Sequence, residues 1–191
     1  MRRDAKRTRD RLLVATGELL ESVGPNFTLP DLARQAGVGV ATVYRHFTDT
    51  AQAHAEFERR TVADLLAEFG RLPPDLDSMQ RFERMCIVWV RRSQSEGAAA
   101  RFIRSPHGFL ERTDTEIDAP IHALAVALRA ALQGLVDDAV IPEQDLEVAS
   151  LIWITLFDER VVIDLTRALH WTTTHTSRHL GESLLGALGR S

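Results

Sequence analysis

Cysteine is almost absent from this chain, which has a single one, Cys86, among 191 residues. One thiol cannot form an internal disulfide framework, and so few cysteines are typical of a reducing compartment, so we expect a cytoplasmic protein. No stretch approaches the ~20 apolar residues of a membrane-spanning helix, and we therefore expect no membrane association. The stretch 12–20 includes Gly17 and Glu18 and has no cleavage pattern, which argues against a signal peptide.

Strand patterns, internal repeats and low-complexity segments are also missing from the sequence. Apolar residues make up 45% of the chain, which is enough for a sizeable hydrophobic core. They recur at the three- and four-residue intervals of amphipathic helices rather than in alternation. These features predict an all-α protein.

Charge is distributed unevenly along the chain. The whole sequence carries a net charge of −4. Residues 1–47 carry a net charge of +3, and the remainder carries −7. A basic head on an acidic body fits a DNA-binding domain joined to a domain with another task, although chance imbalance would also explain a difference of this size.

The segment 27–36 has the features of a short, well-capped helix. Phe27 and Leu32 have the spacing of a hydrophobic staple, and Thr28 with Asp31 has the spacing of a capping box. Pro30 falls in the first turn, where its missing N–H costs little. A helix therefore begins near Thr28 and carries an apolar stripe toward the core.

A second short helix follows after a glycine turn. Gly37 can adopt a positive φ, which ends the first helix and turns the chain sharply. Val43 and Phe47, four residues apart, give the second helix a buried side. The residues left to face outward are Val40, Ala41, Thr42, Tyr44, Arg45 and His46. This layout is typical of a helix-turn-helix, whose second helix enters the DNA major groove.

The runs Ala36-Gly37-Val38 and Thr42-Val43-Tyr44-Arg45-His46-Phe47 resemble the signature of the TetR family of bacterial transcriptional repressors. Two residues depart from the usual pattern. Gly39 replaces the common serine cap of the recognition helix, at a cost of only a few tenths of a kcal/mol. Thr50 replaces a lysine that touches a DNA phosphate, so one backbone contact of the family is in question.

The resemblance implies an all-α fold with two parts. Residues 1–50 would form a three-helix, helix-turn-helix DNA-binding head, and residues 51–191 a helical body for effector binding and dimerisation. The basic residues that precede Leu12 would either form an arm along the DNA or remain a frayed, solvated terminus.

The outward-facing residues of the motif are our candidates for DNA contact. Four of them match positions where the family touches the DNA backbone: Thr28, Thr42, Tyr44 and His46. Val40 and Ala41, small and apolar, could meet a thymine methyl group. Arg45 is the best candidate for reading a guanine, unless it contacts phosphate alone. Tyr44 could alternatively be a core aromatic.

Helical spacing predicts the body as a series of helices. The expected ranges are 51–70, 77–96, a short helix from 97 to about 104, 121–136, a long helix from 142 to about 169, and 173–188. The last two carry more apolar surface than one chain can cover, which indicates a homodimer joined as a four-helix bundle. The resemblance implies the same arrangement. Such a dimer would require double-stranded DNA with a palindromic operator.

The resemblance also implies an unknown small-molecule effector bound among the body helices. Candidate lining residues, which could equally be ordinary core or surface, are Trp89, Phe102, Phe109, Trp153 and Phe157, with His107, His122 and Asp158 to orient a ligand. A regulator without any small ligand is the alternative. In the ligand-controlled case, binding would favour a state whose recognition helices no longer match the operator, which makes the protein a repressor released by its effector.

Catalysis and metal binding have weaker support in the sequence. His175 and His179 share one helix face at a spacing that zinc sites use, but no third potential ligand lies at a sequence spacing typical of such sites. Gly37-Val38-Gly39 lacks the third glycine and the preceding strand of a dinucleotide-binding loop. We therefore expect no cofactor, no metal and no enzymatic activity, with a helical metal-binding or catalytic protein as the remote alternative.

Overall fold

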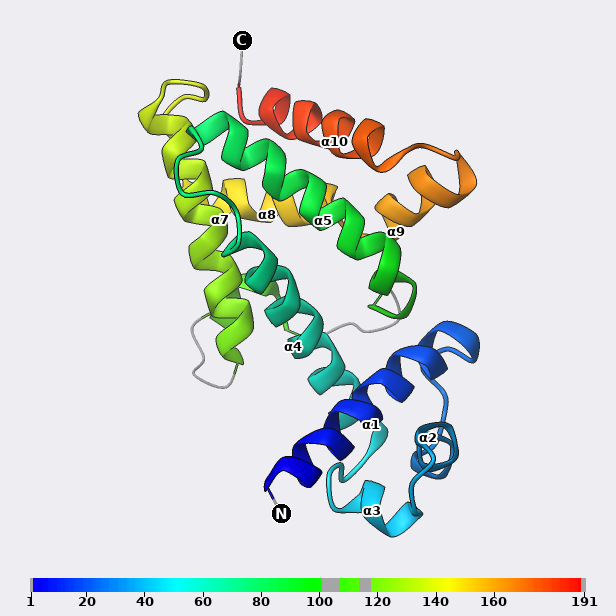
Figure 1. Ribbon diagram of the computed structural model, residues 1–191. Helices are drawn as coiled ribbons and strands as arrows, with labels where there is room; N and C mark the ends of the chain where they lie inside the picture. The colour runs from blue at the N-terminus through cyan, green and yellow to red at the C-terminus, as the bar shows by residue number, and fades with distance from the viewer. Residues whose placement is uncertain (1, 101–106, 114–117, 190–191) are drawn as a thin grey trace.

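The computed structural model describes residues 2–100, 107–113 and 118–189, and within these ranges every regular element is a helix. The expected all-α class is confirmed. In Figure 1 a small group of helices at one end is joined by a single long helix to a larger helical body. The smaller group and its connecting helix comprise α1 (Arg2–Ser22), α2 (Leu29–Ala36), α3 (Val40–Tyr44) and α4 (Thr50–Phe69).

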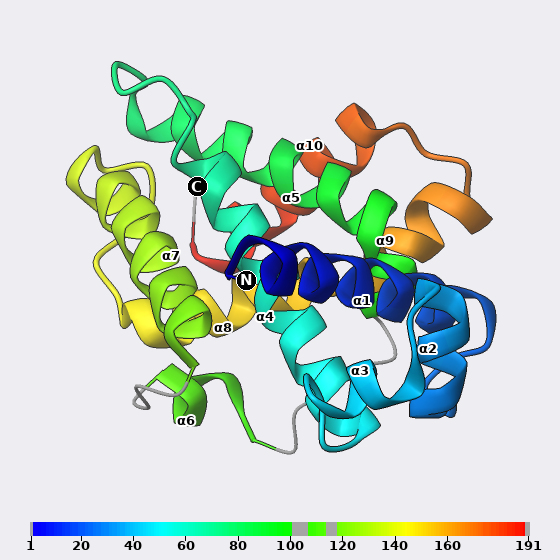
Figure 2. The ribbon, with the colours of Figure 1, turned by 60° about the horizontal axis from the view of Figure 1, so that its bottom comes forward.

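The larger group completes the chain. Its elements are α5 (Ser78–Ala100), α6 (Phe109–Thr113), α7 (Ala119–Asp137), α8 (Leu146–Leu156), α9 (Glu159–Ile163), the π-helix η2 (Asp164–Ala168) and α10 (Thr173–Ala187). In Figure 1, α10 lies across α5 at the end remote from the small group, with α8 behind α5. Figure 2 shows α1 passing in front of the body and α6 beside the start of α7.

Local sequence determines the boundaries of α2 and α3. Thr28 and Asp31 form the predicted capping box, in which each side chain accepts a hydrogen bond from the other residue's backbone N–H. Gly37 ends α2 in the left-handed conformation, with φ 63° and ψ 40°. Gly39 caps α3 without a side-chain bond, as a glycine must. Val43 in the last turn of α3 and Phe47 just after the helix are fully buried, which anchors the C-terminal end of this short helix.

Two separate hydrophobic clusters exist, and α4 contributes to both. Its first half places Ala53 and Phe57 in the cluster formed by α1, α2 and α3. Its second half places Leu65 and Phe69 in the cluster of the body. One helix therefore joins the core of the body to the core of the smaller unit.

The first correction to the predicted helices concerns α5. The sequence predicts a helix to about Glu96 and a separate short helix from Gly97, but α5 continues through Ala100 without a break. A single glycine inside a helix costs only about 1 kcal/mol relative to alanine, which the alanines that follow it can offset. The remainder of the predicted short helix lies outside the described residues.

The second correction concerns the long helix predicted from Pro142 to Leu169. The structure instead begins α8 at Leu146, where Asp145 accepts from two backbone N–H groups, and ends it at Leu156. Asp158 then caps α9 by accepting from the N–H of Arg160, and η2 follows. Phe157, which follows α8 at the break, is fully buried, so apolar spacing continues across the break although the helix does not.

A third difference concerns α7, which by length and composition could cross a membrane. It has 19 residues, and its mean hydropathy reaches 1.4. By length and composition, the expectation that no segment approaches a membrane-spanning helix is therefore wrong. In the fold this helix lies against α4, α6 and α8. Leu128, Leu132 and Leu135 are fully buried in the body core, and we therefore interpret α7 as a core helix.

Candidate DNA-binding surface and body cavities

The exposed face of α3 carries the predicted contact residues. Val40 is 43% exposed and Tyr44 is 56% exposed, and Ala41 and Arg45 are also exposed. Tyr44 is therefore not a core aromatic, which removes that alternative. Thr42 is half-buried and its Oγ1 accepts a hydrogen bond from Nη2 of Arg45 at 3.0 Å. Thr28, at the start of α2, is exposed and engaged in its capping box.

His46, just after α3, differs from the other candidates because it is half-buried. Burial lowers the pKa of its imidazole, and the nearby guanidinium groups of Arg9 and Arg45 lower it further. Both effects favour the neutral form of the ring. A neutral ring still offers one N–H, which suffices to donate to a phosphate oxygen.

Two arginines of α1 hold the helix-turn-helix in place, and neither role was predicted. Arg9 donates both Nε–H, at 2.6 Å, and Nη2–H to the carboxylate of Glu56 on α4. The same guanidinium lies 5.8 Å from the ring centre of Phe47. Arg11 donates to the backbone oxygen of Ala36 at 2.6 Å, at the end of α2. The sequence shows these residues only as part of a basic cluster, because their partners lie 25 and 47 positions away.

The basic residues at the start of the chain belong to α1. The backbone is helical from Arg2 onward, which differs from the predicted frayed terminus, whereas contact of these residues with DNA stays a prediction. Lys6 and Arg7 are exposed. The beginning of α1 and helix α3 lie at the same end of the molecule in Figure 1. Exposed positive charge therefore lies on the same side as the candidate contact residues.

Three of the predicted effector-lining residues belong to the body core. Trp153 and Phe157 are fully buried and Trp89 is 6% exposed. Their rings pack on one another, with ring centres 5.9–6.4 Å apart. Nε1 of Trp153 is buried and, within the described part of the chain, has no hydrogen-bond partner. The aromatic cluster therefore contains one buried polar group, the indole N–H of Trp153.

The remaining predicted effector residues are dispersed. Phe109 is half-buried at the start of α6, and His107 is exposed and contacts Glu111 at 2.9 Å. His122 is exposed, and its Nδ1 lies 2.7 Å from the carbonyl oxygen of Thr113. Asp158 caps α9 and pairs with Arg160, as stated above. The structure does not bring these four residues together around one point, and Phe102 lies outside the described residues.

Cavities occur at places in the described structure that no sequence pattern indicates. A cavity of about 450 Å³ lies between α5 and α10, and is lined by Phe82, Cys86, Ser177 and Gly181 among others. A smaller one of about 220 Å³ lies where α1, α4 and α5 meet. Trp89, Trp153 and Phe157 line neither cavity. Both depend on contacts between distant segments, which helical periodicity cannot reveal.

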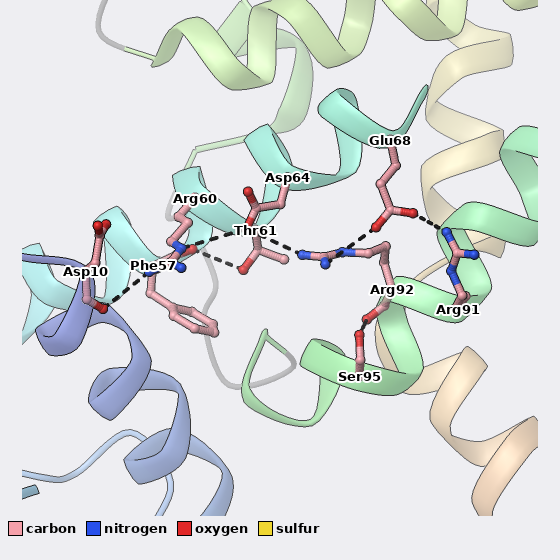
Figure 3. A network of polar contacts seen from close by, with 9 residues as sticks. All are labelled: Asp10, Phe57, Arg60, Thr61, Asp64, Glu68, Arg91, Arg92 and Ser95. Atoms are coloured by element: carbon pink, nitrogen blue, oxygen red, sulfur yellow. Dashed lines mark hydrogen bonds and ion pairs between the residues drawn. The ribbon is translucent and has the colours of Figure 1, made fainter. Parts of the chain in front are cut away.

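Arginine–carboxylate pairs connect α4 to the rest of the molecule. Arg112 of α6 donates to both oxygens of Glu58, at 2.8 and 3.1 Å, and to Asp118 before α7 at 2.7 Å. Figure 3 shows a second group, in which Arg92 of α5 lies between Asp64 and Glu68. Arg91 also pairs with Glu68. Helix α4 is thus bound electrostatically to α1, α5 and α6.

The C-terminal histidines do not form a recognisable metal site. The rings of His175 and His179 are 6.4 Å apart and each meets the edge or face of Trp171, at 4.3 and 5.1 Å. Across the described ranges, no group of three His, Cys, Asp or Glu side chains is arranged to hold a metal ion. The structure therefore adds no support to the metal-binding alternative.

Comparison with known proteins shows what the smaller unit resembles. Residues 12–52 match the family model of bacterial regulatory proteins of the tetR family. An HTH-type transcriptional regulator of Staphylococcus aureus strain USA300 is 29% identical over 100 residues, which cover 52% of this chain and 54% of that relative. The match thus spans about half the length of this curated relative. The matched family consists of regulators rather than enzymes, in agreement with the prediction of no enzymatic activity.

Solved structures extend the likeness of the fold over the whole chain. The fatty acid degradation regulator FadR from Bacillus halodurans has a TM-score of 0.76 and 14% identity, covering 96% of this chain and 97% of its own. RolR, solved in complex with the ligand resorcinol, has a TM-score of 0.67 and 16% identity, covering 100% of this chain and 92% of its own. At such low identity these similarities establish the fold alone.

Proposed function

We propose that this chain is a sequence-specific, DNA-binding transcriptional regulator of the TetR family, with a cytoplasmic location. The main support for the proposal is the exposed face of α3. This helix is held in place by the capped helix α2 and by the hydrophobic core of the smaller unit. Val40, Ala41, Tyr44 and Arg45 are presented to solvent while Val43 and Phe47 are completely buried behind them. A helix of this kind is suited to the DNA major groove.

The candidate contacts divide into two kinds. Hydroxyl and imidazole groups of Thr28, Thr42, Tyr44 and His46 would position the protein on phosphate oxygens. Arg45 would read a guanine through its two-pronged guanidinium, and Val40 with Ala41 would meet thymine methyl groups. Phosphate contacts supply affinity, whereas the base contacts supply sequence preference.

We propose that residues 1–50 form the DNA-binding head and residues 51–191 the effector-binding and dimerisation body. Two hydrophobic clusters support a division into two parts, and Ala53, Phe57 and Ala99 of the second part pack in the cluster of the head. Val148, Val161 and Leu169, which are 39–58% exposed on α8, on α9 and after η2, are apolar surface for a partner to cover. A homodimer would place its recognition helices about 34 Å apart, or a multiple of this, on a palindromic operator.

The regulator would act as a repressor that a small-molecule effector releases from DNA. The fold that it shares with RolR, which was solved with resorcinol, is compatible with this mode of control. Effector binding would shift α4 through its ion pairs with α5 and α6, and α4 would move the head through the Arg9–Glu56 pair. The coupling would be reciprocal, so operator DNA would weaken effector binding by the same factor.

A regulator that has no small ligand is the second candidate. Its support is the packing of Trp89, Trp153 and Phe157, whose mutual contacts fill the region where the sequence predicts the effector. Such a protein would respond to a partner protein or to its own abundance. The DNA-binding part of the proposal is common to both candidates.

Selection of bound sites from random duplex DNA tests the proposal. The purified full chain should enrich a palindromic sequence with two equivalent half-sites. Compounds would then be screened for release of the enriched DNA, which separates the two candidates for control. If no sequence is enriched above the input pool at low salt, the proposed regulator function is wrong.

A further inference from the structure

The cavity between α5 and α10 has the size and lining of a small-molecule site. Its volume of about 450 Å³ falls within the ~300–1,000 Å³ of typical ligand pockets. Apolar side chains from both helices line it: Met79, Phe82, Ile87 and Leu185. Phe82 and Leu185 are almost fully buried, whereas Met79 and Ile87 are half-buried. A hydrocarbon group could therefore leave water by entering it.

Gly181 of α10 shapes the floor of this cavity. A Cβ atom at this position would lie 3.4 Å from Cε1 of Phe82 and 3.6 Å from Sγ of Cys86. These are ordinary van der Waals distances, so alanine would fit, and the methyl group would occupy space that glycine leaves open. The shape of the floor can thus be changed without disturbing the fold.

The rim of the cavity carries more negative than positive charge. Glu83 and Glu182 line it, both are exposed, and within the described part of the chain neither forms an ion pair. Glu83 lies three residues before Cys86 on α5 and both line the cavity; burial, together with the negative charge of Glu83, raises the pKa of the Cys86 thiol. Arg178 also lines the rim, which leaves one negative charge in excess, and its Nη2 lies 3.5 Å from Nδ1 of His175.

A neighbouring hollow extends the cavity along α5. This second space, of about 410 Å³, is lined by Leu76, Gln80, Glu83, Arg84 and Ile87. It shares Glu83 and Ile87 with the first, so both spaces border the same carboxylate and the same apolar side chain. An elongated ligand could keep its charged end at Glu83 while its apolar part lies over Phe82 and Ile87.

We propose that the α5–α10 cavity binds a small organic cation with an apolar chain, whose positive group lies between Glu83 and Glu182. This site is distinct from the aromatic cluster in which the sequence places an effector, and it goes beyond the proposed function. Apolar burial would supply most of the affinity and the two carboxylates the preference for positive charge.

Calorimetric titration of the purified full chain, without DNA, tests the site with a matched pair of probes. Octyltrimethylammonium and octanoate, both below their micellar concentrations, have the same chain length and opposite charge. The cation should bind saturably and more tightly than octanoate. Glu83→Gln and Glu182→Gln should each weaken cation binding roughly two- to fivefold, whereas Glu143→Gln, at an exposed position off the cavity, should leave it unchanged.

The floor provides an independent variant. Gly181→Ala, which favours helix and should remain folded, should weaken cation binding about fourfold because it displaces roughly one methylene of the ligand. Octanoate binding as tightly as the cation, unchanged affinity in both glutamate variants, or no saturable binding would each overturn the proposal. None of these results depends on DNA, so failure here is distinguishable from failure of the proposed regulator function.

Discussion

Arg45 has a local partner that it must leave in order to read a base. Its guanidinium donates to Oγ1 of Thr42, three residues earlier on the same surface. An exposed bond of this kind is weak, and a guanine edge that accepts two hydrogen bonds would compete with it successfully. The pair therefore holds the arginine along α3 before DNA binds.

We predict that Arg45→Ala relaxes base preference at one position of each operator half-site, by about 1–3 kcal/mol of discrimination. Repeating the selection from random DNA with the variant measures this directly. Arg71→Ala, an exposed arginine just beyond α4, serves as the control and should leave the selected sequence unchanged. An even loss of affinity over all sequences would instead assign Arg45 to phosphate contact.

Residue-level prediction succeeded where the chemistry is local. The capping box, the left-handed Gly37 and the buried pair Val43 and Phe47 all depend on residues within a few positions of one another. The roles of Arg9 and Arg11 depend on partners in other helices, so no spacing in the sequence indicates them. Long-range polar contacts are set by the tertiary fold rather than by local pattern.

At the scale of elements, α4 is the helix to which both parts of the molecule are bonded. Glu56 is held by Arg9 of α1, and two residues further on Glu58 is held by Arg112 of α6. Burial lowers the pKa of Arg112, but the carboxylates of Glu58 and Asp118 outweigh this effect and raise it above its ordinary value. The position of α4 is thus fixed from both sides by charge-assisted hydrogen bonds.

We predict that Arg112→Gln and Glu58→Gln each lower affinity for the selected DNA at least fivefold, because α4 loses its anchor on the body. The double variant should be no worse than Arg112→Gln alone, since Arg112→Gln already removes the bonds to Glu58 together with the bond to Asp118. Fluorescence anisotropy with labelled operator DNA measures all three. The matched control is Arg91→Gln, which removes an exposed pair at the body end of α4 and should change affinity little. Additive losses in the double variant would refute the coupling.

The head should lose stability in mild acid. Burial lowers the pKa of both His46 and His54, the latter on α4 with its ring edge-on to Phe27. A histidine whose pKa is lowered by folding binds protons more readily when unfolded. Its contribution to stability is therefore complete above the unfolded pKa of about 6.5 and declines as pH falls below that value.

We accordingly predict a lower urea midpoint at pH 5.5 than at pH 7.5. The double variant His46→Gln/His54→Gln should show a smaller difference between the two conditions, as measured by circular dichroism. A variant whose midpoint falls as steeply as that of the natural sequence would show that other groups cause the effect.

Element boundaries were predicted less well than element type. Periodicity located α4, α7 and α10 to within two residues, because each has one buried face along its whole length. It failed between Pro142 and Leu169, where caps at Asp145 and Asp158 divide an apolar run into three short elements. Side-chain caps compete with helix continuation, and apolar spacing alone does not show which prevails.

At the scale of the whole molecule, the all-α class and the position of the helix-turn-helix followed from the sequence. The cavities did not, since the α5–α10 cavity joins residues about 100 positions apart in the chain. The candidate effector residues were chosen for their type, and several prove to be core, caps or surface groups instead. Aromatic composition indicates burial, whereas a pocket depends on how the buried groups meet.

The central claim is that the exposed face of α3 enters a DNA groove, and Ala41→Glu tests it most directly. Ala41 is exposed in the first turn of α3, where an acidic side chain suits the helix and should not unfold it. Affinity for the selected DNA would be measured together with thermal stability, with Ala130→Glu on the exposed face of α7 as the matched control. Loss of DNA binding by Ala41→Glu alone, at unchanged stability, is the predicted result. Equal DNA affinity in both variants and the natural protein would contradict the account.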